Sequence, residues 1–105
     1  MQTIEKSKTM LNQTEYREMA KIFKALSDET RLRIMHFLLE NGRHCVMEIA
    51  EALSISQTAS SRNLKMLRER GFLRDERINP CIYYDVVPEH IELIEFLTKK
   101  LKEKE

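Results

Sequence analysis

The sequence predicts a mainly α-helical fold that carries one small β-hairpin. Apolar residues recur at helical spacing along most of the chain, and its 105 residues include only two glycines and two prolines, which favours compact helices. After Gly71 the pattern changes to a rough alternation, which is typical of strands. We expect about five helices and a two-stranded hairpin in a single domain, residues 13–105, after a polar and flexible arm, residues 1–12.

Two helices are predicted before residue 42. From Thr14 an apolar stripe marks the first helix, formed by Tyr16, Met19, Ala20, Phe23 and Leu26. Ser27 or Asp28 can cap the second helix, and Asn41 with Gly42 can end it. Its inward residues should be Leu32, Met35, Leu38 and Leu39.

A helix-turn-helix is predicted next. Val46, Ile49, Ala50 and Leu53 have the spacing of one buried helix face. Ser56 can cap a second helix that runs from about Gln57 to Arg70 and ends at Gly71. The buried side of that helix should consist of Ala59, Leu64 and Leu67. Its outward side should consist of Gln57, Thr58, Ser60, Ser61, Arg62 and Lys65.

This outward face has the chemistry of a DNA-reading helix. Hydroxyl and amide side chains near a helix N-terminus can approach base edges and phosphates, and the long cations can contact the backbone. Between Ser56 and Arg74 the chain has five cations and one acid, a local balance of +4, although the formal net charge is only +1. We therefore predict DNA contacts by Ser56, Gln57, Thr58, Ser60, Ser61, Arg62 and Lys65. The alternative is a merely solvated helix face.

The predicted hairpin follows this helix directly. Residues 72–77 and 81–86 alternate as two strands around a turn. A hairpin in this place is a wing, and Arg74 and Arg77 could contact phosphates. The alternative is a hairpin that only covers the core.

The last helix should contribute to a dimer. Pro88 suits its first turn, and Ile91, Ile94, Leu97 and Leu101 line one side. That surface is broad for a chain of this size, so we expect it to pack on a second copy together with Tyr16, Met19 and Phe23 of the first helix. The alternative is packing within one chain alone.

Three stretches resemble the ArsR/SmtB family of winged-helix repressors: residues 23–34 (FKALSDETRLRI), 55–71 (ISQTASSRNLKMLRERG) and 82–85 (IYYD). The resemblance covers about residues 16–100. It implies a homodimeric repressor that binds operator DNA and is released by an effector. Metal-sensing members carry Cys-Val-Cys at the third helix, where this chain has Cys45, Val46 and Met47. The three-thiolate site is therefore in doubt, since a thioether does not replace a thiolate for zinc, cadmium or arsenite.

Two other family features are missing from this sequence. The Asp-x-His site of the last helix has no counterpart, because His90 is the only histidine there. The wing tip reads Asn79, Pro80 and Cys81 where many members have Gly-Arg and an aromatic residue, so the wing-tip arginine of those members has no equivalent in this chain.

Cys45 is the candidate effector residue. It follows Arg43 and His44 at a predicted helix N-terminus, a setting that favours the thiolate. Three interpretations stay open: a packed cysteine, a redox or thiol-reactive switch, and a ligand to a soft metal or metalloid ion. No cofactor is certain. Cys81, on a predicted wing strand, is expected to be a small packing residue. A disulfide with Cys45 would need their Cα atoms within about 7 Å.

Other functional classes have less support. No phosphate-binding glycine loop, zinc-protease motif or nucleophile with its base occurs in the sequence, so we expect no enzyme. There is no run of about 18 apolar residues and no apolar stretch at the N-terminus. We therefore expect a cytoplasmic protein without a membrane partner. The remaining alternative to a DNA-binding regulator is a winged-helix module that binds protein.

Overall fold

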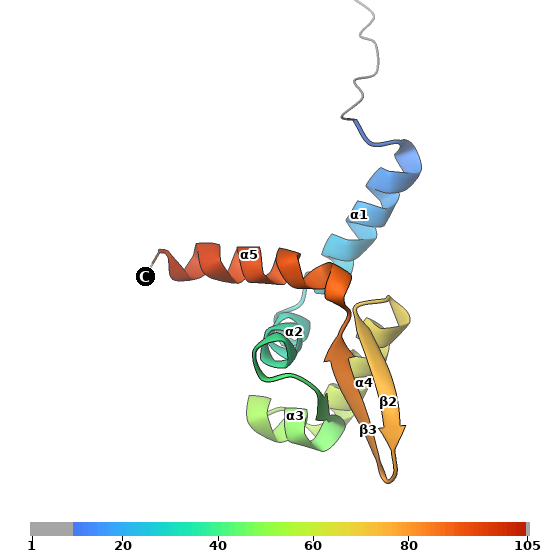
Figure 1. The fold of residues 1–105 in the computed structure, drawn as a ribbon, viewed down its shortest axis with the longest axis vertical. Helices are drawn as coiled ribbons and strands as arrows, with labels where there is room; N and C mark the ends of the chain where they lie inside the picture. The colour runs from blue at the N-terminus through green and yellow to red at the C-terminus, as the bar shows by residue number, and fades with distance from the viewer. Residues whose placement is uncertain (1–9, 105) are drawn as a thin grey trace, which may run out of the picture.

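The computed structural model describes residues 10–104, and Figure 1 shows a helical body with a hairpin at one side. The elements in chain order are α1 (Gln13–Leu26), α2 (Glu29–Asn41), β1 (His44–Cys45), α3 (Val46–Leu53), α4 (Gln57–Glu69), β2 (Leu73–Ile78), β3 (Cys81–Val86), the 3₁₀ turn η1 (Pro88–His90) and α5 (Ile91–Lys102). The predicted fold class is confirmed. The proposed arm, residues 1–12, falls mainly outside the described residues.

Side-chain caps fix where the helices begin. Asn12 and Glu15 form a reciprocal capping box at α1. Of the two candidates for α2, it is Asp28 that accepts the backbone N–H of Arg31, at 3.0 Å. Gly42 follows α2 with φ +76°, a conformation that residues with a Cβ adopt at a steric cost.

The sheet has three strands rather than the two predicted. Its order is β1-β3-β2, with antiparallel pairing throughout. His44 and Cys45 pair with Tyr84 and Tyr83 of β3. A two-residue strand has no periodic pattern of its own, so only its pairing with a distant strand defines it. The segment before α3 is therefore tied directly to the hairpin.

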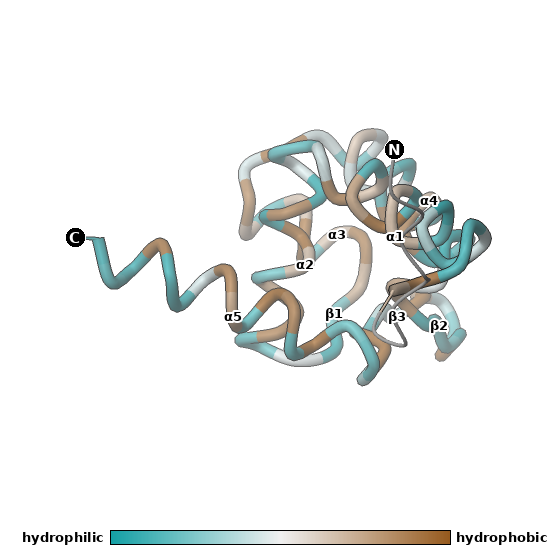
Figure 2. Tube along the Cα trace, turned by 90° about the horizontal axis from the view of Figure 1, so that it is seen from above, coloured by the Kyte–Doolittle hydropathy of each residue, from teal (hydrophilic) through white to brown (hydrophobic). Residues whose placement is uncertain are grey.

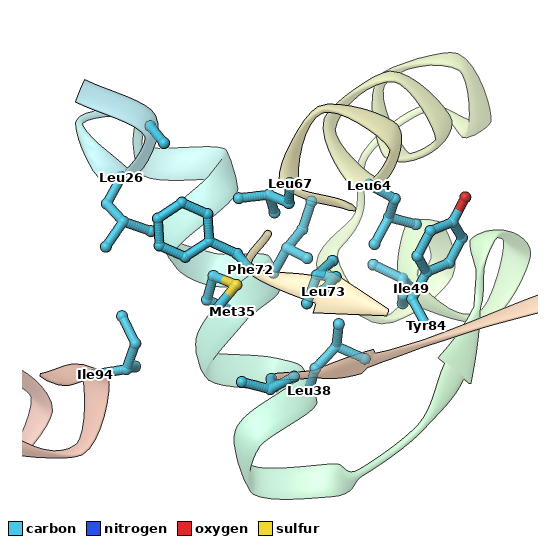
Figure 3. Packing of buried hydrophobic residues seen from close by; sticks show 13 residues of the cluster. Leu26, Met35, Leu38, Ile49, Leu64, Leu67, Phe72, Leu73, Tyr84 and Ile94 are labelled. Atoms are coloured by element: carbon cyan, nitrogen blue, oxygen red, sulfur yellow. The ribbon is translucent and has the colours of Figure 1, made fainter. Parts of the chain in front are cut away.

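The core lies between α2, α3, α4 and the inner face of the hairpin (Figure 3). Its fully buried members include Ile34, Met35, Leu38, Ile49, Leu64, Leu67, Phe72 and Tyr84. The predicted inward face of α2 was partly wrong. Leu32 is 40% exposed and Leu39 is only half-buried, whereas Ile34 is completely buried. The core packs against the face of α2 that is centred between Ile34, Met35 and Leu38. Leu32 lies at the edge of that face.

Helix α1 extends outward beyond the body in Figure 1, and α5 does so in both Figure 1 and Figure 2. Only the ends nearest the body are anchored, through Ala25 and Leu26 in α1 and Ile94 in α5. Ile94 is 4% exposed within its own chain, so its assignment to the subunit interface was wrong. It packs on the core because it faces α2 at the start of the helix.

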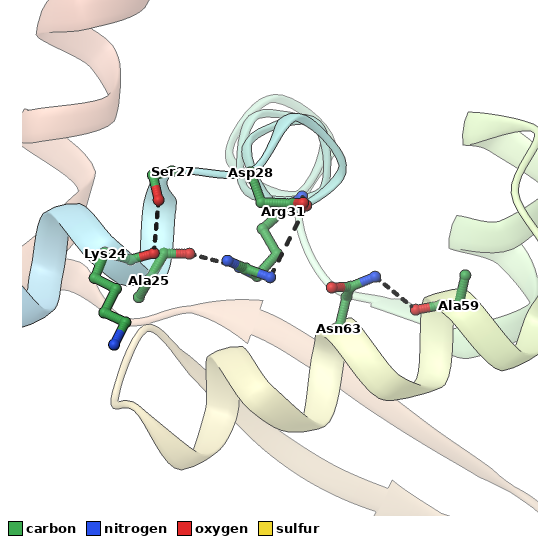
Figure 4. A network of polar contacts seen from close by, with 7 residues as sticks. All are labelled: Lys24, Ala25, Ser27, Asp28, Arg31, Ala59 and Asn63. Atoms are coloured by element: carbon green, nitrogen blue, oxygen red, sulfur yellow. Dashed lines mark hydrogen bonds and ion pairs between the residues drawn. The ribbon is translucent and has the colours of Figure 1, made fainter.

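Arg31 joins the first two helices. Its Nε donates to the carbonyl oxygen of Ala25 near the end of α1, and its guanidinium lies 4.0 Å from the Asp28 carboxylate (Figure 4). Ala25 is completely buried. A helix C-terminus leaves backbone carbonyl groups without hydrogen-bond partners inside the helix. Arg31 provides a donor for one of these carbonyls, that of the buried Ala25.

We expect the substitution Arg31→Met to lower the free energy of unfolding by about 1–3 kcal/mol, because it leaves a buried carbonyl without its donor. Chemical denaturation followed by circular dichroism would measure the change. The matched control is Arg62→Met, at an exposed position without an ion pair among residues 10–104. Equal stability losses in both variants would contradict the proposed role.

Candidate nucleic-acid interface

The outer face of α4 is polar and accessible. Gln57, Thr58, Arg62 and Lys65 are exposed and Ser61 is half-buried. Together with Val46 they line a shallow surface hollow of about 570 Å³. The structure thus brings five of the predicted DNA-contacting residues onto one continuous face.

Ser60 does not belong to this face, and its predicted DNA contact was wrong. Its side chain is completely buried, and its hydroxyl donates to the carbonyl oxygen of Val46 at 3.0 Å. A buried hydroxyl needs such a partner. Ser60 therefore positions α4 against the start of α3.

Asn63 is a buried polar residue of α4 that the sequence pattern did not reveal to us. It is 8% exposed, and its amide donates to the carbonyl oxygen of Ala59 at 2.9 Å (Figure 4). Its place three residues after Ser60 on the same helix face is the signal that could have revealed its burial.

The N-terminus of α4 is capped but remains accessible. The Ser56 hydroxyl oxygen accepts the backbone N–H of Ala59 at 3.0 Å, and Ser56 itself is exposed. Its hydroxyl proton is still available to a ligand. The partial positive charge of the helix N-terminus favours anionic oxygens next to Gln57 and Thr58.

The cations near α4 differ in their ion pairs. Arg68 lies 3.4 Å from the Asp75 carboxylate, and Arg74 lies 3.7 Å from that of Asp85. Arg62 and Lys65 have no carboxylate partner within the described part of the chain. Arg70 and Arg77 also have no carboxylate partner among residues 10–104, so the positive charge left for an external anion includes these two arginines as well as the outer face of α4.

The two wing arginines lie on opposite faces of the hairpin. Leu73 and Val86 are Cα partners and both face the core, so alternation places Arg77 on the inner face and Arg74 on the outer face. The inner face also carries Asp75, which pairs with Arg68 of α4. Arg77 thus lies on the side of α4, whereas Arg74 lies on the other side and is already paired with a carboxylate.

The residues assigned to a dimer interface are mostly accessible. Tyr16, Met19 and Phe23 of α1 and Leu97 and Leu101 of α5 are all exposed, and Leu101 is 66% exposed. Ile91 is half-buried and packs against the core cluster. Leu97 and Leu101 also line a hollow of about 500 Å³ between α2 and α5.

Cys45 is buried, which agrees with the first of the three interpretations, a packed cysteine. It is 6% exposed, its backbone N–H donates to the Glu48 carboxylate at 2.9 Å, and burial raises the pKa of its thiol. The expected preference for the thiolate is thus wrong for the free protein, because desolvation outweighs the backbone N–H groups of the α3 N-terminus. The same backbone hydrogen bond from Cys45 lowers the pKa of Glu48.

Neither cysteine is in a disulfide. Across residues 10–104, no group of three or more His, Cys, Asp and Glu side chains is arranged to hold a metal ion. The same residues contain no helix long and apolar enough to cross a membrane.

Comparison with known proteins agrees with this geometry. The family model described as "Bacterial regulatory protein, arsR family" matches residues 28–75. The arsenic resistance transcriptional regulator ArsR1 of Pseudomonas putida is 38% identical over 78 residues, which cover 74% of this chain and 61% of that protein. This chain therefore spans about three fifths of the length of that curated relative.

Two further similarities extend over nearly whole proteins. MJ1325 of Methanocaldococcus jannaschii, an uncharacterized HTH-type transcriptional regulator, is 33% identical over 83% of this chain and 98% of its own length. The crystal structure of AntR, an antimony-specific transcriptional repressor, superposes with a TM-score of 0.85 and 31% identity over 92% of this chain and 88% of that chain. These similar proteins are transcriptional regulators, not enzymes, and the chain belongs to the ArsR family of winged helix-turn-helix transcriptional regulators.

Proposed function

We propose that this chain is a homodimeric, sequence-specific DNA-binding repressor that an effector releases from its operator. The observation that carries the proposal is the outer face of α4, where Gln57, Thr58, Ser61, Arg62 and Lys65 are accessible together. Amides and hydroxyls on a helix can read base edges in a major groove, and cations hold the helix on the phosphates.

The hairpin would add a contact beside α4. Arg77 is exposed on the inner face of β2, on the same side as α4. A cation in this place can reach the phosphate backbone next to the groove that α4 occupies. Arg74 would contribute less, because contact with a phosphate competes with its ion pair to Asp85.

The exposed apolar surfaces of α1 and α5 support a dimer. Apolar side chains that remain this accessible on a small domain are typical of an interface. The occupant that fits them is a second copy of this chain, because a two-fold dimer would present two α4 helices to adjacent turns of DNA. Half-sites about 34 Å apart are the expectation for such a dimer.

For the effector, we propose a chemical class and not a specific molecule. Relatives are named for arsenic, cadmium and antimony, so a soft metal or metalloid ion, or a thiol-reactive signal, is the class we propose. A three-thiolate site within one chain does not fit this protein, since it has only two cysteines.

We expect Arg62→Ala and Lys65→Ala each to weaken operator binding. Each should also reduce the slope of log affinity against log salt by about 0.9 for every phosphate that the variant no longer neutralises. Fluorescence anisotropy with DNA selected from a random pool would measure both quantities. Lys21→Ala on α1 removes the same charge far from α4 in sequence and is the control. Wild-type affinity in both α4 variants, or binding insensitive to salt, would favour a protein-binding module instead.

Ser60→Ala should reduce the free energy of unfolding by about 0.5–1.5 kcal/mol, because it removes the hydrogen bond to Val46. The preferred operator sequence should stay the same, since the hydroxyl does not face DNA. Selection of bound fragments by wild type and variant would compare the preferences. A changed base preference would show that Ser60 reads DNA after all.

The double variant Leu97→Asp, Leu101→Asp should be monomeric at micromolar concentration, where the wild type should be a dimer, because charges cannot be buried in an apolar interface without a partner. Light scattering gives the mass. Ile78→Asp, at an exposed apolar position on the hairpin, is the matched control. A monomeric wild type would contradict the dimer proposal.

A further inference from the structure

The hollow on the outer face of α4 has one apolar wall. Val46 lines it together with five residues of α4, all of which are polar or charged. Val46 is the first residue of α3 and is half-buried. It continues the stripe of Ile49 and Ala50, which are 0% and 4% exposed, out to the surface. The apolar stripe of α3 therefore ends at the face that we propose for DNA.

The position of Val46 is fixed relative to α4. Its carbonyl oxygen accepts the hydroxyl of the buried Ser60 at 3.0 Å. Val46 also packs against the apolar core cluster, and the residue before it, Cys45, is paired with β3. A valine in a helix has one strongly preferred side-chain rotamer. Val46 thus presents a rigid apolar surface, which loses little conformational entropy when it binds a partner.

The charge of α3 is unsuited to phosphate contacts. The charged residues of this helix are Glu48 and Glu51, and both are exposed. Exposed carboxylates are repelled by the phosphate backbone. The contribution of α3 to the interface is therefore expected from an uncharged residue next to α4, and Val46 is the residue of α3 that lines the hollow.

An apolar surface in this place suits one group of the major groove. The base edges there are donors and acceptors, except for the C5 methyl group of thymine. A donor or acceptor held against Val46 would lose its water partners without gaining a hydrogen bond. A methyl group in the same place loses no hydrogen bond, and its removal from water is favourable. The wall formed by Val46 is therefore complementary to thymine.

We propose that Val46 contacts the C5 methyl group of one thymine in each half-site and is a specificity-determining residue of this protein. The proposal rests on the proposed DNA-binding function and adds a base preference to it. Polar groups of α4 hydrogen-bond to base edges, whereas Val46 of α3 distinguishes thymine from bases that lack the methyl group. Removal of one methyl group from water strengthens binding about fourfold.

The proposal is tested with operators in which one thymine at a time is replaced by deoxyuridine. This replacement removes the C5 methyl group and leaves the base pairing intact. The operator is first selected from random DNA with the wild-type protein, and affinities are measured by fluorescence anisotropy at one salt concentration. We expect one position in a half-site at which deoxyuridine weakens wild-type binding about fourfold. In Val46→Ala the same replacement should have no effect.

A second probe restores the methyl group instead of removing it. At the same position, a cytosine should weaken binding, and 5-methylcytosine, whose methyl group lies in the same part of the groove, should recover about fourfold in the wild type and nothing in Val46→Ala. Val87→Ala shortens a half-buried valine outside the hollow and is the matched control. It should keep the wild-type ratio of thymine to deoxyuridine affinities. Circular dichroism would confirm that each variant is folded.

Three results would overturn the proposal. In the first, Val46→Ala weakens binding to the thymine and deoxyuridine operators equally, which would place Val46 against the sugar-phosphate backbone. In the second, the methyl effect survives in Val46→Ala and disappears in Thr58→Ser, so that the contact belongs to the methyl group of Thr58. In the third, no thymine shows a methyl effect although the operator binds, which leaves the DNA-binding function standing. A protein that binds no selected DNA would refute that function, and this proposal with it.

Discussion

The attachment of α4 to the body through its inner face is the constraint on which the rest of the molecule depends. Leu64 and Leu67 are completely buried, and burying each such side chain stabilises the fold by about 1.5–3 kcal/mol. The Ser60 hydroxyl adds a directional bond to α3. Apolar packing alone would permit small rotations of the helix, but a hydrogen bond to one carbonyl oxygen limits them. The polar face is therefore presented outward in a fixed orientation, as a DNA-reading surface requires.

The three-stranded sheet links that surface to the segment before α3. β1 is short, but its backbone pairing with β3 makes the residues around Cys45 part of the hairpin. The ion pair between Arg43 and Glu76 spans the same junction. Exposed ion pairs contribute little energy, so the backbone pairing provides most of the connection. A change at Cys45 can consequently affect both α4 and the wing.

The terminal helices show how a small domain divides its apolar surface. Ile94 anchors α5 to its own core, while Phe96, Leu97 and Leu101 stay accessible farther along the same helix. One chain of 105 residues has too little other structure to cover them. The projecting arrangement of α1 and α5 in Figure 1 therefore suits an interface between two copies.

Local patterns in the sequence determined the helices, their caps, the hairpin and the polar face of α4, because helical periodicity and turn residues act over a few neighbouring positions. Only the tertiary structure decided that β1 exists, that Ser60 and Ile94 point inward, that Arg74 is paired with Asp85, and that Val46 lines the hollow on α4. Each of these features depends either on a partner that is distant in sequence or on the exact rotation of a helix about its own axis, to within the angle between two successive residues. Periodicity alone does not specify either, since a helix position at the edge of the apolar stripe can face the core or the solvent according to what packs against it.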